Sequence, residues 1–300
     1  MATSLAFGRR RSIGRMGRAA PAYLSLPPSP AAARFLESLW VQDHPESRAD
    51  WPATTVVPAG RLEVVACYGD PFEHIDECGV SSVPRVALMG QRTRAIRVRA
   101  TGRTGLVLAS LHPWAARALF GDDAPALRDS FVEAAAVLGD ANARSLAEAV
   151  AASAAPALRA RALEAALLRI LRPDGIDLSV AQAVAWINGA YGAIPVQTLA
   201  SGLGLSRRQL SRRFQAASGL PPKDLATIVR FQKALGLLHS GASAADVAAR
   251  CGLYDQSHLI RLIRERADRS PRRLPARRTD TLGRTFNRSD LSAYYNAVYL

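Results

Sequence analysis

Residues 196–217 read VQTLASGLGLSRRQLSRRFQAA, and residues 244–267 read AADVAARCGLYDQSHLIRLIRERA. Each stretch begins with a short helix-like segment, continues through a turn at a glycine (Gly204 or Gly252), and then has a polar residue suited to cap a helix. Each ends in a second helical segment with basic residues on one face. This order is typical of the helix-turn-helix, whose second helix enters the major groove of DNA. The sequence therefore predicts two such units in one chain.

The segment between the two units, residues 221–241, predicts a single helix that joins them. Pro222 suits the first helical position and Gly241 suits a C-terminal stop, and the apolar residues between them recur at helical spacing. A helix of about 17 residues is roughly 25 Å long. With the offset of each recognition helix added, the span reaches the ~34 Å of one DNA turn. A bridge of that length would let both recognition helices meet the same face of a duplex.

Positive charge is concentrated in the same part of the chain. The 300 residues carry a formal charge of +14, of which residues 176–300 contribute +10 and residues 1–18 contribute +5. Residues 19–175 contribute −1. An excess on the segment with the paired motif is the electrostatic footprint expected of a phosphate-binding surface. An arginine-rich composition of the whole chain is the alternative explanation, but it does not account for the difference between the segments.

The predicted fold class is α+β. It combines a small N-terminal β-sandwich or barrel that carries helices with an all-α C-terminal domain, in which a linker helix joins two helix-turn-helix units. Between Trp51 and about Leu119, short strand-like runs are broken by Gly and Pro, which favours the sandwich or barrel. From Pro113 onward the pattern is helical, and it stays so through residues 125–171. Residues 33–41 fit either a short amphipathic helix or a strand.

Charge and linker composition divide the chain into four segments. They are a basic flexible arm (residues 1–20), a sensor or assembly domain that is β-rich and then helical (21–171), a DNA-binding domain with both motifs (177–275) and a C-terminal tail (276–300). The residues between the two domains, 172–176, read RPDGI and form a turn-rich linker. A chain of this length is sufficient for two domains.

Several classes of protein are disfavoured by what the sequence contains. Its three cysteines form no even disulfide framework, which favours a reducing cytoplasm. Its apolar runs are shorter than the ~20 residues that a membrane span needs, so no membrane partner is expected. We find no nucleophile elbow, phosphate-binding loop, zinc-protease motif or dinucleotide-binding glycine motif. The chain is therefore not expected to be an enzyme or to hold a cofactor.

The two motifs resemble the DNA-binding domain of the AraC family of bacterial transcriptional regulators. The resemblance is carried by residues 199–225, LASGLGLSRRQLSRRFQAASGLPPKDL, and by residues 243–274, SAADVAARCGLYDQSHLIRLIRERADRSPRRL. Two positions depart from the family pattern, since that family usually has Phe where Ile263 stands and Gly where Asp268 stands. The resemblance implies a transcription factor that binds double-stranded DNA and responds to a ligand or a partner.

The N-terminal half resembles a sensor-like domain that is often fused to this module. The residues that carry this resemblance are WPATTVVPAGRLEV (51–64), GQRTR (90–94) and HPWAARALFG (112–121). A small-molecule effector of unknown identity, RNA polymerase and a second copy of the chain are the further partners that we consider. Pairing of two copies would raise the effective concentration of the second DNA-binding module on one operator.

The spacing of apolar residues separates a buried face from a DNA face on each recognition helix. Leu210 and Phe214 predict the buried face of the first helix, and Leu259 and Ile263 that of the second. Asp255 is expected to cap the second helix. The candidates for contact with bases are Arg208, Gln209, Ser211 and Arg212 in the first helix, and Gln256, Ser257, His258 and Arg261 in the second.

A second group of basic residues is expected to contact phosphates, which adds affinity without sequence information. These candidates are Arg207, Arg213, Lys223, Arg230, Arg264, Arg272 and Arg273. The alternative for all of these positions is a basic face that contacts only solvent. The presence of the whole paired motif favours the DNA interpretation.

Trp51, Glu63 and Trp114 are the candidates for a small-molecule pocket in the N-terminal half, and core packing is the ordinary alternative for the aromatic residues.

The spacing of Cys67, His74 and Cys78 matches no standard zinc pattern, so no metal is expected. The predicted function is a sequence-specific DNA-binding transcriptional regulator of the AraC type, whose N-terminal domain senses a small molecule or a partner. The alternative from another class is a thiol or metal redox sensor, or an enzyme-like N-terminal domain, which the basic half only localises to DNA. An architectural DNA binder without sequence preference is a third hypothesis.

Overall fold

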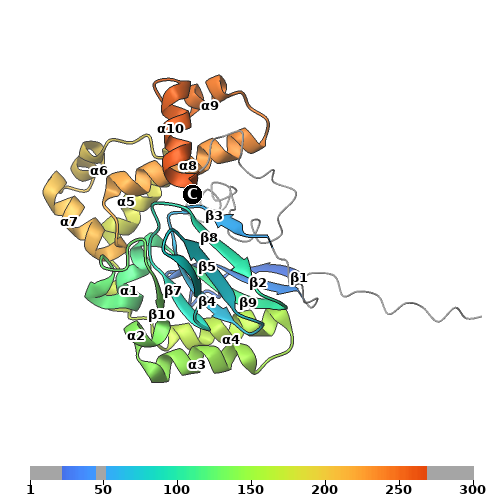
Figure 1. Cartoon of the computed structure of the whole chain (residues 1–300). Helices are drawn as coiled ribbons and strands as arrows, with labels where there is room; N and C mark the ends of the chain where they lie inside the picture. Colours follow the sequence, from blue (N-terminus) through green and yellow to red (C-terminus); the bar gives the residue numbers. More distant parts are fainter. Residues whose placement is uncertain (1–21, 45–51, 269–300) are drawn as a thin grey trace, which may run out of the picture.

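The computed structural model describes residues 22–44 and 52–268. Figure 1 shows a β-domain with helices beneath it and a C-terminal group of helices above and beside it. Several predictions fall outside the described residues and concern the basic arm, the C-terminal tail, Trp51, Arg272 and Arg273.

The described strands form two antiparallel sheets. The first sheet has the order β1-β2-β9-β4-β7-β10 and the second has the order β3-β8-β5-β6. The strands of the first sheet are β1 (Ala22–Leu26), β2 (Leu36–His44), β4 (Leu62–Cys67), β7 (Val86–Met89), β9 (Thr104–Leu111) and β10 (Phe131–Glu133). Those of the second sheet are β3 (Thr54–Val56), β5 (Phe72–Asp76), β6 (Gly79–Ser82) and β8 (Ile96–Ala100).

The two sheets pack against each other through apolar side chains at alternate strand positions. Val65 and Cys67 of β4 share a buried cluster with Val98 and Ala100 of β8. The alternation follows from the two-residue period of a strand, which sends successive side chains to opposite faces. Strands β4 and β9 are buried along their whole length because helices cover the other face of the first sheet. The predicted N-terminal sandwich with helices is confirmed.

Two local predictions are resolved by the tertiary structure. Residues 33–41 fitted a helix or a strand, and the chain forms strand β2 from Leu36. Residues 125–171 were expected to be helical throughout, which is wrong for Phe131–Glu133, because this segment is strand β10 and pairs antiparallel with β7. Three residues are too few to show a strand period, and the open edge of the first sheet decides their conformation.

Helices of the N-terminal half cover the outer face of the first sheet. The short ones are η1 (Pro113–Ala115), α1 (Ala116–Phe120), η2 (Gly121–Asp123) and α2 (Ala134–Leu138). The longer pair, α3 (Asp140–Ala151) and α4 (Pro156–Leu168), lies beneath the sheet (Figure 1). A single turn, η3 (Pro173–Gly175), leads into the C-terminal helices at the predicted linker.

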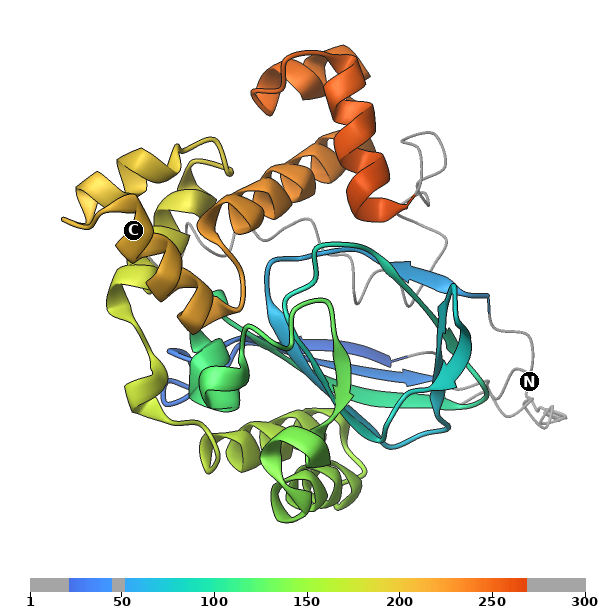
Figure 2. The same cartoon turned by 60° about the vertical axis from the view of Figure 1, so that its left-hand side comes forward.

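The C-terminal part is entirely helical over its described residues and contains both predicted helix-turn-helix units. Its helices are α5 (Leu178–Gly189), α6 (Val196–Gly202), α7 (Arg207–Ser218), α8 (Pro222–His239), α9 (Ala244–Arg250) and α10 (Gln256–Ala267). The predicted linker helix is α8, which begins at Pro222 and has 18 residues, or about 27 Å of length. Figure 2 shows α8 bridging the two units above the β-domain.

The first helix-turn-helix unit shares a hydrophobic core with the N-terminal half. Leu210 and Phe214 of α7 belong to the same buried cluster as Trp114 and Leu119, and α7 packs against η1 and α1. The second unit has its own cluster, which includes Val57 of the N-terminal half. The two halves of the chain are therefore packed together on both sides of α8.

Candidate nucleic-acid interface

Both recognition helices begin with a capped first turn. The Ser206 hydroxyl accepts a hydrogen bond from Gln209 N at 3.2 Å, and Gln209 Oε1 accepts one from Ser206 N at 2.9 Å. This reciprocal capping box satisfies two backbone amides at the start of α7. At the start of α10, Asp255 Oδ1 accepts from His258 N at 2.7 Å, so the predicted cap is confirmed. Gln209 was predicted to contact a base, and in this structure its side chain completes the cap.

The turns before the recognition helices depend on glycine. Gly204 has a φ of +66° and Gly252 a φ of +62°. Residues with a Cβ rarely adopt this left-handed region, whereas glycine enters it without strain. The two glycines therefore fix where each unit turns, as the sequence predicted.

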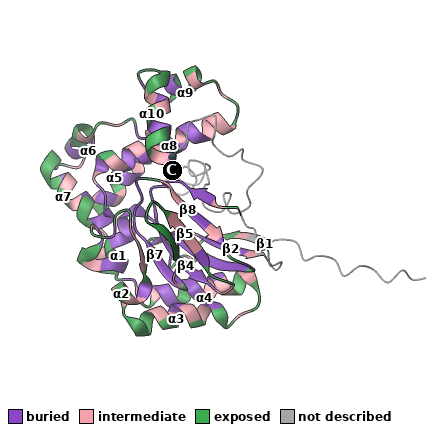
Figure 3. Cartoon of the chain, viewed as in Figure 1, coloured by how far each residue is buried: buried purple, intermediate pink, exposed green. Residues whose placement is uncertain are grey.

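The first recognition helix, α7, separates its two faces cleanly. Leu210 and Phe214 are fully buried, as predicted from their spacing. Arg208 and Arg212 are exposed and Ser211 is half-buried, and the outer side of α7 is largely exposed in Figure 3. The exposed arginines have the donor geometry that pairs with guanine in the major groove.

The second recognition helix, α10, has the same division. Leu259 and Ile263 are fully buried. Gln256, Ser257 and Arg261 are exposed, while His258 is partly covered. The predicted base-contact residues of α10 thus lie on one accessible face, apart from the partial cover over His258.

The second turn carries an exposed residue that sequence reasoning missed. Tyr254 is 94% exposed and directly precedes the cap of α10. The signal was present in the sequence, since Gly204 is two residues before its cap and Gly252 is three residues before its cap. The extra residue places an aromatic ring and a hydroxyl beside the start of α10.

The predicted phosphate contacts differ in how free their side chains are. Arg207, Lys223 and Arg264 are exposed. Arg213 makes a two-pronged ion pair with Asp177 at 2.7 and 2.9 Å, and Arg230 Nη2 donates to Gly192 O at 2.6 Å.

The Asp177 carboxylate makes two sets of contacts. It caps α5 by accepting hydrogen bonds from two backbone amides, and it holds Arg213 of α7. Burial raises the pKa of Asp177, but the hydrogen bonds from Arg213 and the amides outweigh it and leave the pKa below its ordinary value of 3.8. The ion pair therefore ties α5 to the first recognition helix.

We expect the Asp177→Asn variant to be less stable than the wild type near neutral pH and equally stable in acid. A carboxyl group with a lowered pKa stabilises the fold above its unfolded value, and this contribution is lost as the pH falls through the folded value. The gap between the two thermal melts should therefore shrink below about pH 4. Asparagine still caps a helix, so the comparison isolates the charge. If the difference in melting temperature between the two proteins stays constant down to about pH 3, the charge of the ion pair contributes nothing to stability.

The two departures from the family pattern have structural explanations. Ile263 is fully buried and fills a core position in α10. Asp268 follows the last turn of α10 with a φ of 53° and a ψ of 28°, in the left-handed region that glycine prefers. Aspartate enters this region more readily than most residues with a Cβ, which explains how it substitutes for glycine there.

The candidate pocket residues of the N-terminal half serve other purposes. Glu63 is buried and accepts hydrogen bonds from Arg61 and Arg92 at 3.1 Å each. Trp114 is buried, stacks on His112 with ring centroids 4.1 Å apart, and donates from Nε1 to Arg34 O at 3.0 Å. Neither residue lines the cavity between the sheets.

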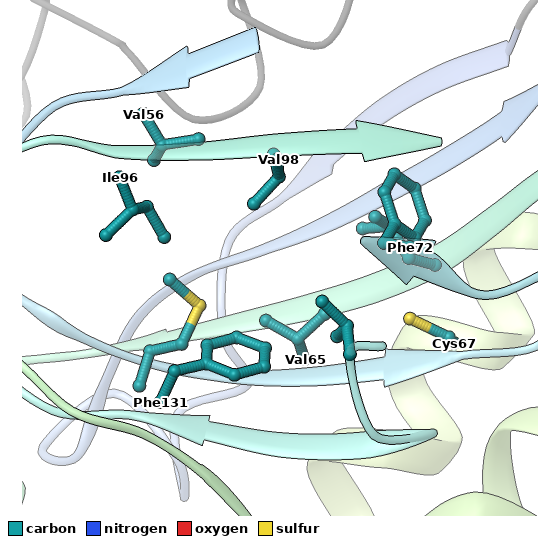
Figure 4. Close-up of a pocket in the computed structure, with 10 residues that line it drawn as sticks. Val56, Val65, Cys67, Phe72, Ile96, Val98 and Phe131 are labelled. Atoms are coloured by element: carbon teal, nitrogen blue, oxygen red, sulfur yellow. The ribbon is translucent and has the colours of Figure 1, made fainter. Parts of the chain in front are cut away.

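That cavity is small, with a volume of about 20 Å³. Figure 4 shows apolar side chains from both sheets pointing into it. Val56, Phe72 and Val98 come from the second sheet, and Val65 and Phe131 come from the first. Sequence reasoning missed it because facing positions on separate strands come together only once the register is set.

The two cysteines of the N-terminal half lie in different surroundings. Cys67 is buried in the cavity wall, and burial raises its pKa to about 12. Cys78 is exposed at the turn between β5 and β6. Within the described residues, no group of three or more His, Cys, Asp or Glu side chains is placed to hold a metal ion. A thiol that stays protonated at neutral pH is a poor redox centre.

Comparison with known proteins adds to this geometry. Residues 199–277 match a family described as a helix-turn-helix domain, and residues 24–133 match a domain of unknown function, DUF6597. The HTH-type transcriptional activator RhaS of Klebsiella pneumoniae (strain 342) is 37% identical over 98 residues, or 32% of this chain and 35% of RhaS. RhaS of Escherichia coli (strain K12 / DH10B) is 35% identical over 91 residues, or 30% and 33%. The chain spans about a third of the length of these curated relatives.

Solved structures show a lower level of likeness. ToxT from Vibrio cholerae covers 77% of this chain and 96% of its own, with a TM-score of 0.43 and 9% identity. The C-terminal domain of AraT, a response regulator from Geobacillus stearothermophilus, covers 35% and 93%, with a TM-score of 0.31 and 24% identity. Within the described residues, no helix has the length and apolar character that crossing a bilayer requires.

Proposed function

We propose that this chain is a sequence-specific DNA-binding transcriptional regulator of the AraC type, which its C-terminal pair of helix-turn-helix units resembles. The observation that carries the proposal is the pair of capped recognition helices held by α8, each with a buried apolar face and an exposed polar face. Helix α7 offers Arg208 and Arg212, and α10 offers Gln256, Ser257 and Arg261. Side chains of these types read guanine and adenine in the major groove.

Selection of binding sites from random DNA duplexes tests this proposal. The full chain should enrich one sequence and bind it at least about 10³-fold more tightly than random DNA at the same salt concentration. Equal affinity for all duplexes would instead indicate an architectural binder, which is the competing hypothesis for a basic paired motif. The full chain is required because the first unit shares its core with the N-terminal half.

Substitutions on the exposed faces should separate base contacts from phosphate contacts. We expect Arg212→Ala and Arg261→Ala each to weaken binding to the selected site by about 1–3 kcal/mol and to relax preference at one base pair. Lys223→Ala, at an exposed position at the start of α8, should weaken all sequences alike and lower the salt dependence. Titrations of selected and random duplexes measure both effects. Equal losses on both duplexes for all three variants would contradict base reading.

The exposed Tyr254 extends the proposed interface. Its place before the cap of α10 would bring the ring and hydroxyl to the DNA backbone when α10 lies in the groove. Arg207 and Arg264 remain proposed phosphate contacts of the same kind as Lys223. Arg213 and Arg230 would have to share their present partners, Asp177 and Gly192, with a phosphate.

The N-terminal half is proposed to supply the regulatory input in the cytoplasm, without an enzymatic reaction. Its formal charge is near balance, so it lacks the excess that phosphate binding requires. A small-molecule effector and RNA polymerase are its proposed partners. A homodimer through the outer helices is also proposed, supported by the exposure of Leu158 on α4. Sedimentation of the full chain as a monomer across micromolar concentrations, with and without DNA, would rule the dimer out.

A redox-sensor or enzyme function for the N-terminal half receives less support. The raised pKa of Cys67 keeps its thiol protonated, and Cys78 is a free, exposed cysteine. This alternative would be supported if Cys67 or Cys78 reacted with iodoacetamide many times faster than a free cysteine does at neutral pH.

A further inference from the structure

The two recognition helices can be compared position by position. Helices α7 and α10 have the same length, 12 residues, and each begins directly after a capping residue, Ser206 or Asp255. The fourth residue after the cap is fully buried in both, as Leu210 and Leu259, and the eighth is also fully buried in both. The same face of each helix is therefore turned to the core. Residues at equal distance from the cap occupy equivalent places on the outer face.

One position on the outer face carries the same residue in both helices. The sixth residue after the cap is an arginine in each, Arg212 in α7 and Arg261 in α10, and both are exposed. The arginine guanidinium pairs with the two acceptor atoms of guanine in the major groove. The two halves of a bound site are therefore expected to share one guanine, at the same place relative to each helix.

The second residue after the cap differs between the helices. It is Arg208 in α7 and Ser257 in α10, and both are exposed. Arg208 lies four residues before Arg212, so the two are about 6 Å apart along the helix axis. Successive base pairs are about 3.4 Å apart, so Arg208 would reach a second guanine about two base-pair steps from the first. Ser257 has a single hydroxyl and cannot make the same two-pronged contact with guanine.

The other residues of the first turn increase this difference. The first turn of α7 (residues 206–209) has two arginines and no acidic residue, whereas that of α10 (residues 255–258) has an aspartate and no arginine or lysine. The Asp255 carboxylate repels the acceptor atoms N7 and O6 that guanine presents in the major groove. Gln256 is exposed, and a glutamine amide pairs with the donor and the acceptor of adenine. The first turn of α10 therefore favours adenine over guanine.

The residue of α7 that could also read adenine is engaged within the helix. Gln209 Oε1 accepts the hydrogen bond from Ser206 N at 2.9 Å that completes the capping box. A side chain held in this way is not free to pair with a base. Base reading by the first turn of α7 is therefore left to arginine, and reading of adenine is left to α10.

We propose that the two helix-turn-helix units read half-sites of different composition, and that Arg208 and Ser257 set the difference. The half-site of α7 has two guanines about two base-pair steps apart. The half-site of α10 has one guanine, read by Arg261, and an adenine, read by Gln256. The bound site is therefore not a repeat of one half, which gives the chain a defined direction on the duplex. The proposal rests on the DNA-binding function proposed above and names the class of sequence that is bound.

Selection from random duplexes by the full chain and by two exchange variants tests the proposal. The wild type should enrich two half-sites about 10 base pairs apart, one with two guanines and the other with guanine and adenine. Arg208→Ser should lose about 10-fold of the preference for one guanine in the first half-site. Ser257→Arg should add a guanine preference of about the same size to the other half-site only. Both positions are exposed, so both variants should keep the melting temperature of the wild type.

Lys223→Ser is the matched control, since it removes a positive charge from an exposed position outside both recognition helices. It should weaken binding to every duplex alike and leave both half-sites unchanged. Gln256→Ala should relax the adenine preference alone. Two half-sites of the same composition, or an Arg208→Ser variant with the base preferences of the wild type, would overturn this proposal and leave the DNA-binding function supported. A selection that enriches no sequence would instead reject both.

Discussion

Replacing Phe214 with alanine is expected to lower the free energy of unfolding by about 3–5 kcal/mol, as for other large side chains removed from a full core. Phe214 is fully buried in α7, four residues after Leu210, and belongs to the cluster that also contains Trp114 of the N-terminal half. The cavity left behind would open where the two halves of the chain meet. Denaturant unfolding of the full chain, followed by tryptophan fluorescence, measures the loss.

A matched control lies one residue further along the same helix. Gln215 is exposed on α7, so Gln215→Ala should change stability by less than about 0.5 kcal/mol. The shared core also predicts that Phe214→Ala loosens the contact of α7 with η1 and α1, and not only the helix-turn-helix unit itself. Similar stabilities of the two variants would mean that Phe214 does not face this core.

Local patterns were sufficient to predict the C-terminal half. Buried residues four apart, a capping residue before each recognition helix and a glycine at each turn all act within a few residues of one another, so the sequence displays them directly. Pro222 and the apolar period after it placed the linker helix in the same way. The buried faces marked by Leu210 and Leu259 were correct for this reason.

Long-range contacts account for what the sequence did not reveal. Strand β10 forms because it pairs with the edge of β7. A segment of three residues is too short for its sequence to show a strand period. The ion pair of Arg213 with Asp177 joins residues 36 positions apart, and an arginine on a basic helix gives no sign of such a partner. The cavity likewise required the register of both sheets. The preference for Trp51, Glu63 and Trp114 rested on residue type, and the structure places the two described ones outside the cavity wall.

The second large effect is expected from Glu63→Gln, which should destabilise the chain by about 3–5 kcal/mol. Glu63 is 1% exposed and pairs with Arg61 and Arg92, which are 4% and 5% exposed. Burial lowers the pKa of Arg92 and the charge of Glu63 opposes this change. Removing the carboxylate takes away the hydrogen-bonded counter-charge that the two buried guanidinium groups share, although Arg61 keeps its ion pair with Glu37 at 3.9 Å.

A partly exposed ion pair in the second sheet provides the control for charge alone. Glu73 pairs with Arg99 at 2.6 Å, but their side chains are 29% and 43% exposed, so Glu73→Gln should cost no more than about 1 kcal/mol. Thermal melts of both variants at the same salt concentration make the comparison. Equal losses would contradict the view that burial, and not charge pairing itself, sets the size of the effect.

The position of the Glu63 cluster gives this prediction a second consequence. Arg61 follows Gly60, whose backbone lies against Leu225 and Ile228 of α8, and Arg92 precedes Thr93, which accepts the hydrogen bond from Arg266 of α10. Loosening the cluster should therefore free the loops that hold the second helix-turn-helix unit. At a denaturant concentration where Glu63→Gln is still folded, amides of α10 should exchange faster than in the wild type, while those of α7 keep their protection. Uniform acceleration in both recognition helices would instead mean that Glu63 supports only global stability.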